Sequence, residues 1–190
     1  IHKIVREVLQ NIGYNSPDYG LDWKTCTVLN AIRGQSPDIA QGEDPGKGAH
    51  KAQGAGDQGM MFGYACRETP ELMPLPIMLA HRLARRLAEV RKKKVLPYLR
   101  PDGKSQVTVE YQNGKPGGVE AGVIAAQHDP DVSPKQLWDD VTAEVIRPVL
   151  GNWMDDRTDV HVNRSGSFVL GGPAADSGLS GRKNIVDTYG

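Results

Sequence analysis

The sequence predicts an α+β fold, with mixed or antiparallel sheets and helices packed on one face. Three stretches repeat apolar residues at the spacing of an amphipathic helix. An Asn-Gly turn at 113–114 lies between two strand-like stretches, as in a β-hairpin. The chain contains no internal repeat. These observations favour hairpins covered by helices within one or two domains.

Each predicted helix has an apolar face and an end signal. Residues 1–12 place apolar side chains at i, i+3, i+4, i+7, i+8 and i+11, and Gly13 stands where a glycine would end that helix. The second helix begins at Pro76 and continues to about Lys94, with an apolar stripe along it. The third follows a capping box at 133–136, with proline at its first position.

Basic residues cover the other side of the second predicted helix. They are Arg82, Arg85, Arg86, Arg91, Lys92, Lys93 and Lys94. They could form a phosphate or nucleic-acid patch. The pattern favours a solvated face, whose last cations suit the negative end of the helix dipole.

Five stretches have the character of strands. The stretches 26–32 and 60–66 are short apolar runs that read as buried strands. The stretches 106–111 and 119–126 form the expected hairpin, and another strand begins at 160–162.

Residues 33–59 form a long polar connection with few apolar side chains. We interpret it either as a plain flexible loop or as a lid over a site whose far wall is the turn 54–59, Gly-Ala-Gly-Asp-Gln-Gly. Glycines allow close backbone approach, so Asp57 and the neighbouring amide could bind hydroxyls and amines of a small polar molecule. The turn is neither a dinucleotide fingerprint nor a Walker loop, because the required spacing is absent. An ordinary turn before a strand is the alternative.

Two further polar groups could bind a ligand. Asp102 and Lys104 lie at the entrance to the hairpin, where a strand end could present both side chains; a simple turn would also use them. Arg182 and Lys183 follow glycines and suit a polyphosphate, because arginine offers a planar fork and lysine a point charge. A surface loop with neutralised charges is the alternative there.

Composition limits the class of protein. The chain has 190 residues, with 23 basic and 23 acidic side chains and a formal net charge of zero. This balance argues against a nucleic-acid partner bound by general phosphate attraction. No apolar run approaches the roughly 20 residues of a membrane helix, and no leader pattern is present. The two cysteines match no metal spacing or disulfide framework, which indicates a reduced, cytoplasmic setting.

Several separated segments match one family in the same order. They are Gln-Ser-Pro-Asp-Ile at 35–39 with Gln-Gly at 41–42, the stretch 54–65, Arg-Pro-Asp at 100–102 with 104–108, Phe-Val at 168–169 with Gly-Gly-Pro at 171–173, and Gly-Leu at 178–179 with 181–183 and 185–190. Over essentially its full length the chain resembles S-adenosylmethionine synthetase, also called methionine adenosyltransferase. Ordered matches of this kind are far more specific than any one motif alone.

The resemblance implies a reaction and its partners. The sulfur of L-methionine attacks C5′ of ATP and displaces the triphosphate, which is then cut to phosphate and diphosphate. Two Mg²⁺ and one K⁺ assist, with ligands mostly outside this chain, so no metal ligand is expected within it. The family forms homodimers with shared active sites, and a homotetramer is possible.

The same resemblance implies site residues. ATP contacts fall on Asp57, Asp102, Lys104, Ser167, Phe168, Asp176, Arg182 and Lys183, and methionine contacts on Gln41, Asp57 and Asp176. Lys104, Arg182 and Lys183 would be the catalytic side chains, because they meet the triphosphate. The ring of Phe168 would stack on adenine. Ser167 stands where many family members have a basic residue.

The resemblance also implies how the chain is divided. Residues 1–45 would end an N-terminal domain and carry the lid, 54–173 would form a central domain, and 174–190 would begin a C-terminal domain. The family builds three similar domains in a pseudo-threefold arrangement. Its opening Gly-His-Pro-Asp motif and later phosphate lysines are missing here, so we expect a piece of a longer protein that alone cannot complete turnover.

Two alternatives remain open. The first is a folded, non-catalytic fragment of that enzyme that keeps part of the ATP-binding and dimerisation surface. The second is an unrelated polyphosphate-binding module that rests only on Asp102, Lys104, Arg182 and Lys183.

Overall fold

The computed structural model describes residues 1–49, 51–56 and 63–176. The chain divides into two units. The larger unit combines Ile1–Cys26 with Ala65–Gly190, and the smaller unit is Thr27–Tyr64. The larger unit contains the sheet and the helices that position the candidate site.

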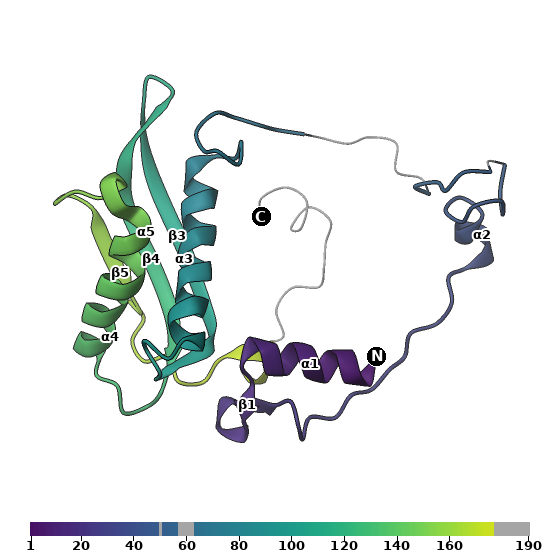
Figure 1. Ribbon diagram of the computed structural model, residues 1–190, viewed down its shortest axis with the longest axis horizontal. Helices are drawn as coiled ribbons and strands as arrows, with labels where there is room; N and C mark the ends of the chain where they lie inside the picture. Colours follow the sequence, from purple (N-terminus) through teal and green to yellow (C-terminus); the bar gives the residue numbers. More distant parts are fainter. Residues whose placement is uncertain (50, 57–62, 177–190) are drawn as a thin grey trace. The chain divides into compact units, whose positions relative to one another are not determined.

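A three-stranded sheet forms the centre of the larger unit (Figure 1). The strands β3 (Leu99–Gln112) and β4 (Lys115–His128) pair antiparallel, and β5 (Asp159–Val162) pairs with β4 in parallel. The turn between the long strands uses Asn113 and Gly114, with φ values of 51° and 75°, as a two-residue hairpin turn requires. The sheet is therefore mixed, and the predicted α+β class is confirmed.

Helices pack on one face of this sheet (Figure 1). One is α3 (Leu75–Lys92), and the other stretch combines α4 (Pro134–Val141), the π-helix η2 (Thr142–Ile146) and α5 (Arg147–Leu150). Their buried aliphatic side chains share one core with β4: Leu75, Leu79, Leu83, Leu87, Val90, Leu137, Val141, Val145, Ile146 and Leu150 pack with Ile124 and Ala126. Each fully buried side chain of this size contributes about 1.5–3 kcal/mol. The apolar stripe predicted for the second helix is confirmed.

The opposite face of the sheet is more accessible. Strand alternation and register place three residues of β3 beside three of β4 on this face: Lys104, Gln106 and Thr108 with Ala121, Val123 and Ala125. These six side chains are exposed or half-exposed, and we call the surface they form the open sheet face. Small apolar residues on an accessible sheet face suit a flat contact with another surface.

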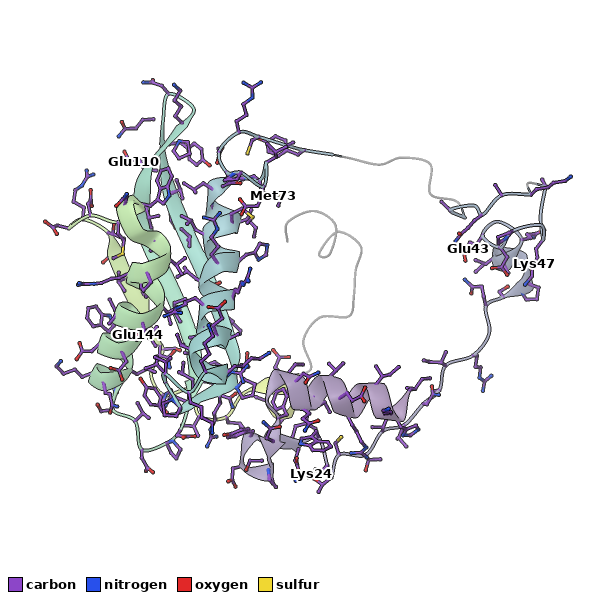
Figure 2. All side chains as sticks on the ribbon, viewed as in Figure 1. Lys24, Glu43, Lys47, Met73, Glu110 and Glu144 are labelled. Carbon is purple, nitrogen blue, oxygen red and sulfur yellow. The ribbon has the colours of Figure 1, made fainter. Side chains whose placement is uncertain are left out.

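The helical stretch 134–150 is continuous although it contains a proline. It starts at the predicted cap, where Ser133 Oγ accepts the N–H of Gln136 at 3.2 Å. Pro148 has no N–H to donate to the carbonyl of Glu144, four residues earlier. Arg86 of α3 supplies that donor, with its Nε 2.8 Å from the carbonyl oxygen. A contact between helices thus satisfies the backbone group that proline leaves unpaired (Glu144 is labelled in Figure 2).

The arginines on the outer side of α3 pair with acids. Arg82 lies 2.9 Å from Glu71, and Arg85 and Arg86 lie 3.5 Å and 3.7 Å from Glu89. For these residues the structure supports the solvated face rather than the phosphate patch. In the part of the chain that the structure describes, no helix combines the length and apolar character needed to cross a bilayer.

The N-terminal segment packs on the end of α3. The helix α1 (His2–Ile12) ends at Gly13, with φ 119°, as predicted. A small sheet of β1 (Asn15–Ser16) and β2 (Leu21–Asp22) follows. The positive φ favours glycine at position 13, and its Cα lies beside the guanidinium of Arg91.

The predicted strand 26–32 is wrong. The stretch is irregular, with Leu29 91% exposed and Ile32 78% exposed. Strand-forming residues need a paired neighbour and a buried face, and these side chains face solvent instead. Of the predicted strand 60–66, residues 63–66 are also irregular and 60–62 lie outside the described residues. The remaining short elements are α2 (Pro37–Ala40), η1 (Pro17–Tyr19), η3 (Gly151–Trp153) and η4 (Gly172–Ala174).

Candidate functional site

The candidate site is centred on Asp102, near the start of β3. Its Oδ2 accepts the N–H of Gly172 at 2.8 Å, and its own N–H donates to Oε1 of Gln127 at 3.2 Å. Nε2 of Gln127 in turn donates to the carbonyl of Val169 at 3.0 Å. These bonds hold the segment 168–172 against the end of the hairpin.

Three side chains converge on the Cα of Gly171, which is buried. A Cβ at this position would lie 2.8 Å from Cε2 of Phe168, 3.0 Å from Cδ of Gln127 and 3.1 Å from Oδ2 of Asp102. The φ of Gly171 is −154°, which any residue can adopt, so lack of space is what requires glycine. The aromatic ring of Phe168 and the carboxylate of Asp102 therefore meet around one backbone atom.

His128, the last residue of β4, fixes the backbone of Phe168. It is 4% exposed, its N–H donates to the carbonyl of Phe168 at 3.0 Å, and its Nε2 lies 3.2 Å from the N–H of Phe168. Its Nδ1 lies 2.8 Å from the carbonyl of Asp129. Because a carbonyl can only accept, Nδ1 carries the hydrogen and Nε2 is the acceptor.

Tyr14 lies behind this segment with its hydroxyl against Gly172. It is buried, and a side chain at position 172 would collide with it. Burial raises the pKa of Tyr14, the charge of Asp102 raises it further, and Arg91 opposes the shift. Burial lowers the pKa of Arg91. The phenol therefore stays neutral beside the site.

Arg100 ties the N-terminal segment to the same region. Its side chain is 9% exposed, and its Nε lies 2.9 Å from Oδ1 of Asp129. Its Nη1 donates to the carbonyls of Asp18 (3.3 Å) and Val169 (3.2 Å), and the guanidinium lies 5.0 Å from the ring centroid of Tyr19. One side chain thus joins three segments.

The structure brings together two of the residues predicted to bind ATP, Asp102 and Phe168. Lys104 follows on the same strand and is exposed on the open sheet face. Ser167 is exposed beside Phe168, and Asp176, also exposed, ends the described part of the chain. Along the chain, an exposed lysine thus follows a carboxylate, and an exposed hydroxyl precedes a ring, that the fold holds in place.

The remaining predicted contacts are Gln41, Asp57, Arg182 and Lys183. Gln41 belongs to the smaller unit, where its Nε2 donates to the carbonyl of Asp38 at 3.0 Å. Asp57, Arg182 and Lys183 lie outside the described residues. Their roles remain predictions from the family resemblance.

Sequence reasoning did not find Tyr14, Gln127 and His128 as parts of the site. Gln127 and His128 carried a usable signal in the sequence, because two polar residues directly follow the apolar stretch 119–126. The structure shows that both are buried. Tyr14 carried no comparable signal, since a tyrosine after a helix-ending glycine is compatible with any surface or core position.

The described residues do not form a metal site. Across residues 1–49, 51–56 and 63–176, no three histidine, cysteine, aspartate or glutamate side chains are grouped as ion ligands would be. The groups around Asp102 are an amide donor and the neutral amide side chain of Gln127, rather than further carboxylates.

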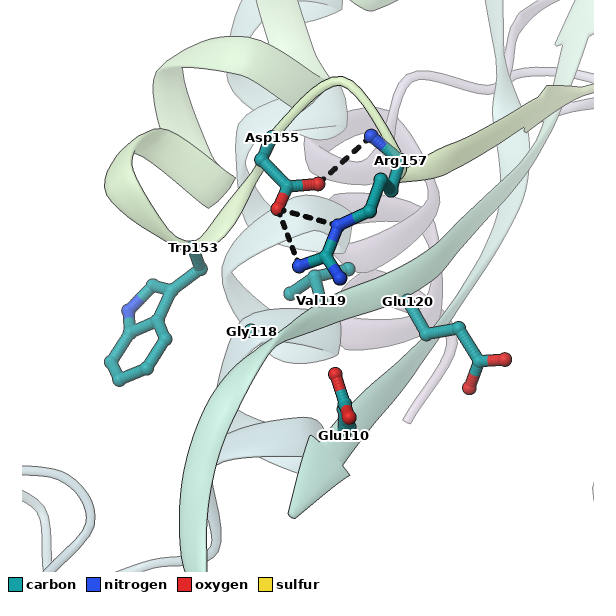
Figure 3. A pocket seen from close by; sticks show the side chains of 7 residues that line it. All are labelled: Glu110, Gly118, Val119, Glu120, Trp153, Asp155 and Arg157. Carbon is teal, nitrogen blue, oxygen red and sulfur yellow. Dashed lines mark hydrogen bonds and ion pairs between the residues drawn. The ribbon is translucent and has the colours of Figure 1, made fainter. Parts of the chain in front are cut away.

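A separate pocket of about 320 Å³ lies beside the far part of the hairpin. Its lining residues are Glu110, Gly118, Val119, Glu120, Trp153, Asp155 and Arg157 (Figure 3). Arg157 is already paired with Asp155 at 2.8 Å. Glu110 lies eight residues along β3 from Asp102, or roughly 25 Å in an extended strand. This pocket is thus distinct from the candidate site.

Comparisons with known proteins give one consistent result. Residues 52–168 match a family described as "S-adenosylmethionine synthetase, central domain". An S-adenosylmethionine synthase of Desulfosudis oleivorans is 57% identical over 188 residues, which cover 98% of this chain and 48% of the relative. That of Syntrophobacter fumaroxidans is 54% identical over 191 residues, covering 100% of this chain and 49% of the relative. The chain thus spans about half the length of these curated relatives.

Proposed function

Because the chain belongs to the S-adenosylmethionine synthetase family, we propose that the protein containing it transfers the adenosyl group of ATP to the sulfur of L-methionine. The observation that carries this proposal is the convergence of Phe168 and Asp102 at Gly171. An aromatic ring and a carboxylate fixed around one backbone atom offer a stacking surface for a base and an acceptor for a hydroxyl or amine.

The reaction is a displacement followed by a hydrolysis. The methionine sulfur forms a bond to C5′ of ATP while the bond from C5′ to the triphosphate oxygen breaks. The tripolyphosphate is then hydrolysed to phosphate and diphosphate. A neutral thioether needs no general base, so alignment and exclusion of water are the main requirements. Cationic groups around the leaving triphosphate stabilise its developing charge.

Each predicted residue has a role in this proposal. Phe168 stacks on adenine with Ser167 beside it, Asp102 contacts ATP, and Asp57 and Asp176 contact the nucleoside and methionine. Lys104, Arg182 and Lys183 bind the triphosphate, and Gln41 belongs to a lid near methionine. The exposed position of Lys104 on the same strand as Asp102 supports its assignment, since a flexible cation there can follow an extended anion.

We further propose that the protein needs two Mg²⁺ and one K⁺, held mostly by residues outside this chain. The support is chemical, because a triphosphate leaving group requires charge neutralisation beyond Lys104, Arg182 and Lys183. Chelation of divalent ions is expected to abolish S-adenosylmethionine formation by the whole protein, and Mg²⁺ to restore it. Full activity after exhaustive chelation would contradict this requirement.

The open sheet face supports a homodimer with shared active sites, with a tetramer as a further possibility. Its alanine and valine side chains can pack flat against a second copy, and Lys104 at its edge would lie near the interface. Light scattering on the whole protein should give a dimer mass, and Val123→Glu should shift it to the monomer. A dimer unaffected by that charge would place the interface elsewhere.

The activity is tested on the whole protein with ATP, methionine, Mg²⁺ and K⁺. We expect S-adenosylmethionine, phosphate and diphosphate in equal amounts, measured by mass spectrometry and colorimetry. Asp102→Asn should lower kcat/KM by about ten- to a hundred-fold, since a charged acceptor is lost. Glu110→Gln, on the same strand but beside the separate pocket, is the matched control. A wild-type protein that forms no S-adenosylmethionine would sink the proposal.

A second proposal concerns the 190 residues by themselves, as a folded fragment that binds ATP without catalysis. Because the chain spans about half the length of its relatives, the 190 residues alone should fold and bind ATP without turnover. Calorimetry with ATP and a product assay on the purified 190-residue chain test this together. S-adenosylmethionine formed by that chain would refute the fragment interpretation.

A further inference from the structure

The backbone of Phe168 is held by one buried histidine, through both its backbone and its side chain. The carbonyl of Phe168 accepts the backbone N–H of His128 at 3.0 Å, and the N–H of Phe168 donates to the side-chain Nε2 of His128 at 3.2 Å. The second bond requires Nε2 to be the acceptor. The carbonyl of Asp129 ensures this, because it takes the hydrogen on Nδ1 at 2.8 Å.

We infer that His128 is the positioning residue for Phe168, and that it acts through the backbone to set where the phenyl ring meets the adenine of ATP. This inference rests on the proposed function, since it takes the ring of Phe168 to stack on the base. His128 touches no ligand itself. His128 is 4% exposed, whereas Phe168 is half-exposed. The histidine therefore holds the Phe168 backbone from the protein interior, while Phe168 itself lies partly at the surface.

The geometry around the ring explains why its position needs fixing from two sides. Gly171 leaves space for the ring, because a Cβ there would lie 2.8 Å from Cε2 of Phe168. Stacking depends on the offset and tilt of the two rings, so a small shift of the backbone loses contact with the base. Misplacement of a binding group by about 1 Å can be costly to a reaction. Methionine does not use this surface, so its binding should not depend on His128.

The structure suggests replacements that separate the acceptor from the rest of the imidazole. In His128→Gln, Oε1 can take the place of Nε2 and accept from the N–H of Phe168. His128→Asn is shorter by one methylene and cannot reach it. His128→Leu removes all polar groups. His81→Leu is the control, because His81 is exposed on α3 and outside the site.

The test measures KM for ATP, KM for methionine and kcat on the whole protein. His128→Leu and His128→Asn should raise the KM for ATP by about ten-fold, the effect of one lost buried hydrogen bond. The KM for methionine and kcat should stay within about two-fold. His128→Gln should restore the KM for ATP, and His81→Leu should leave every parameter unchanged. A uniform loss in all His128 variants, the glutamine included, would make the residue merely structural and overturn the inference.

Hydrogen–deuterium exchange over residues 166–170 examines the contact without activity. The N–H groups there should exchange faster in His128→Leu than in wild type, and at the wild-type rate in His128→Gln. Equal rates in all variants would overturn the inference.

A second variant covers the case in which His128→Leu does not fold. Gly171→Ala crowds the ring from the other side without touching His128, although its methyl group also meets Gln127 and Asp102. It should raise the KM for ATP while sparing that for methionine. An inactive wild-type protein would overturn both this inference and the proposed function. An active protein whose KM for ATP stays at the wild-type value in the folded variants among His128→Leu and Gly171→Ala would overturn this inference alone.

Discussion

At the scale of single residues, Asp102 combines a structural contact with an expected binding role. One oxygen of its carboxylate already accepts the N–H of Gly172 at 2.8 Å. A bond from an amide to a carboxylate is stronger than one between neutral groups, so this oxygen is held in place. The carboxylate can therefore meet a ligand from a defined position, and a mutation here would affect the segment 168–172 as well as the ligand.

A second residue-scale feature is the half-buried phenol of Tyr98. Burial and a 2.7 Å hydrogen bond from its hydroxyl to Asp140 raise the pKa of Tyr98. The folded state therefore holds this proton more tightly than the unfolded state, in which tyrosine ionises near pH 10, about its ordinary value. The stabilisation is complete below that pH and is lost as the pH rises toward the folded pKa.

Tyr98→Phe tests this linkage. At neutral pH the variant should lose about 1 kcal/mol with the hydrogen bond. Above about pH 10 its free energy of unfolding should fall less steeply than that of wild type, by up to about 1.4 kcal/mol per pH unit. Urea unfolding between about pH 8 and 11 gives the free energy of unfolding against pH for wild type and for the variant. Parallel curves above pH 10 would mean that Tyr98 does not contribute to alkaline unfolding.

At the scale of elements, the helical stretch 134–150 depends on its neighbour. Pro148 leaves the carbonyl of Glu144 without its helical donor, and Arg86 of α3 donates to it at 2.8 Å. The adjacent Arg85 makes an ion pair with Glu89 at 3.5 Å, and its side chain is 83% exposed. Two neighbouring arginines of one helix thus differ in how much we expect each to contribute to the stability of the fold.

Arg86→Met should cost about 1–2 kcal/mol of unfolding free energy, because a half-buried carbonyl loses its donor. Arg85→Met is the matched control and should cost less than about 0.5 kcal/mol. In a Pro148→Ala background the helix regains an N–H, so the cost of Arg86→Met should shrink. Urea unfolding of wild type, Arg86→Met, Pro148→Ala and the double variant gives the coupling free energy between residues 86 and 148. Equal costs for the two arginines would argue against the carbonyl contact.

At the scale of the whole molecule, the larger unit is assembled from segments far apart in the chain. Residues 1–26 and 65–176 pack together, and Arg100 contacts carbonyls of Asp18 and Val169 as well as the carboxylate of Asp129. A buried arginine that joins three segments should make the N-terminal segment and the site segment open together rather than separately.

Arg100→Met should therefore destabilise the protein by about 1–3 kcal/mol, because the carbonyl of Val169 and the carboxylate of Asp129 lose a charged donor. It should also speed amide exchange in both 14–22 and 168–172. Arg164→Met, an exposed arginine in the same unit, should change neither. Faster exchange in only one of the two segments would show that Arg100 does not couple them.

The sequence by itself determined the local elements and the family. Apolar spacing located the helices, Gly13 and Ser133 marked two of their ends, and Asn113 with Gly114 specified the hairpin turn. Each of these signals acts over a few residues, where the preferred backbone angles and the helical period are set by the residues themselves. Several ordered motifs were specific enough to identify the family before any contact was known.

Only the tertiary structure decided which polar residues share a site and which apolar run is a strand. Tyr14, Asp102, His128 and Phe168 lie far apart in the chain and meet because β4 ends where the segment after β5 returns. The run 26–32 has strand-like residues but no strand in the structure. Pairing and burial depend on the rest of the fold, which local periodicity does not contain.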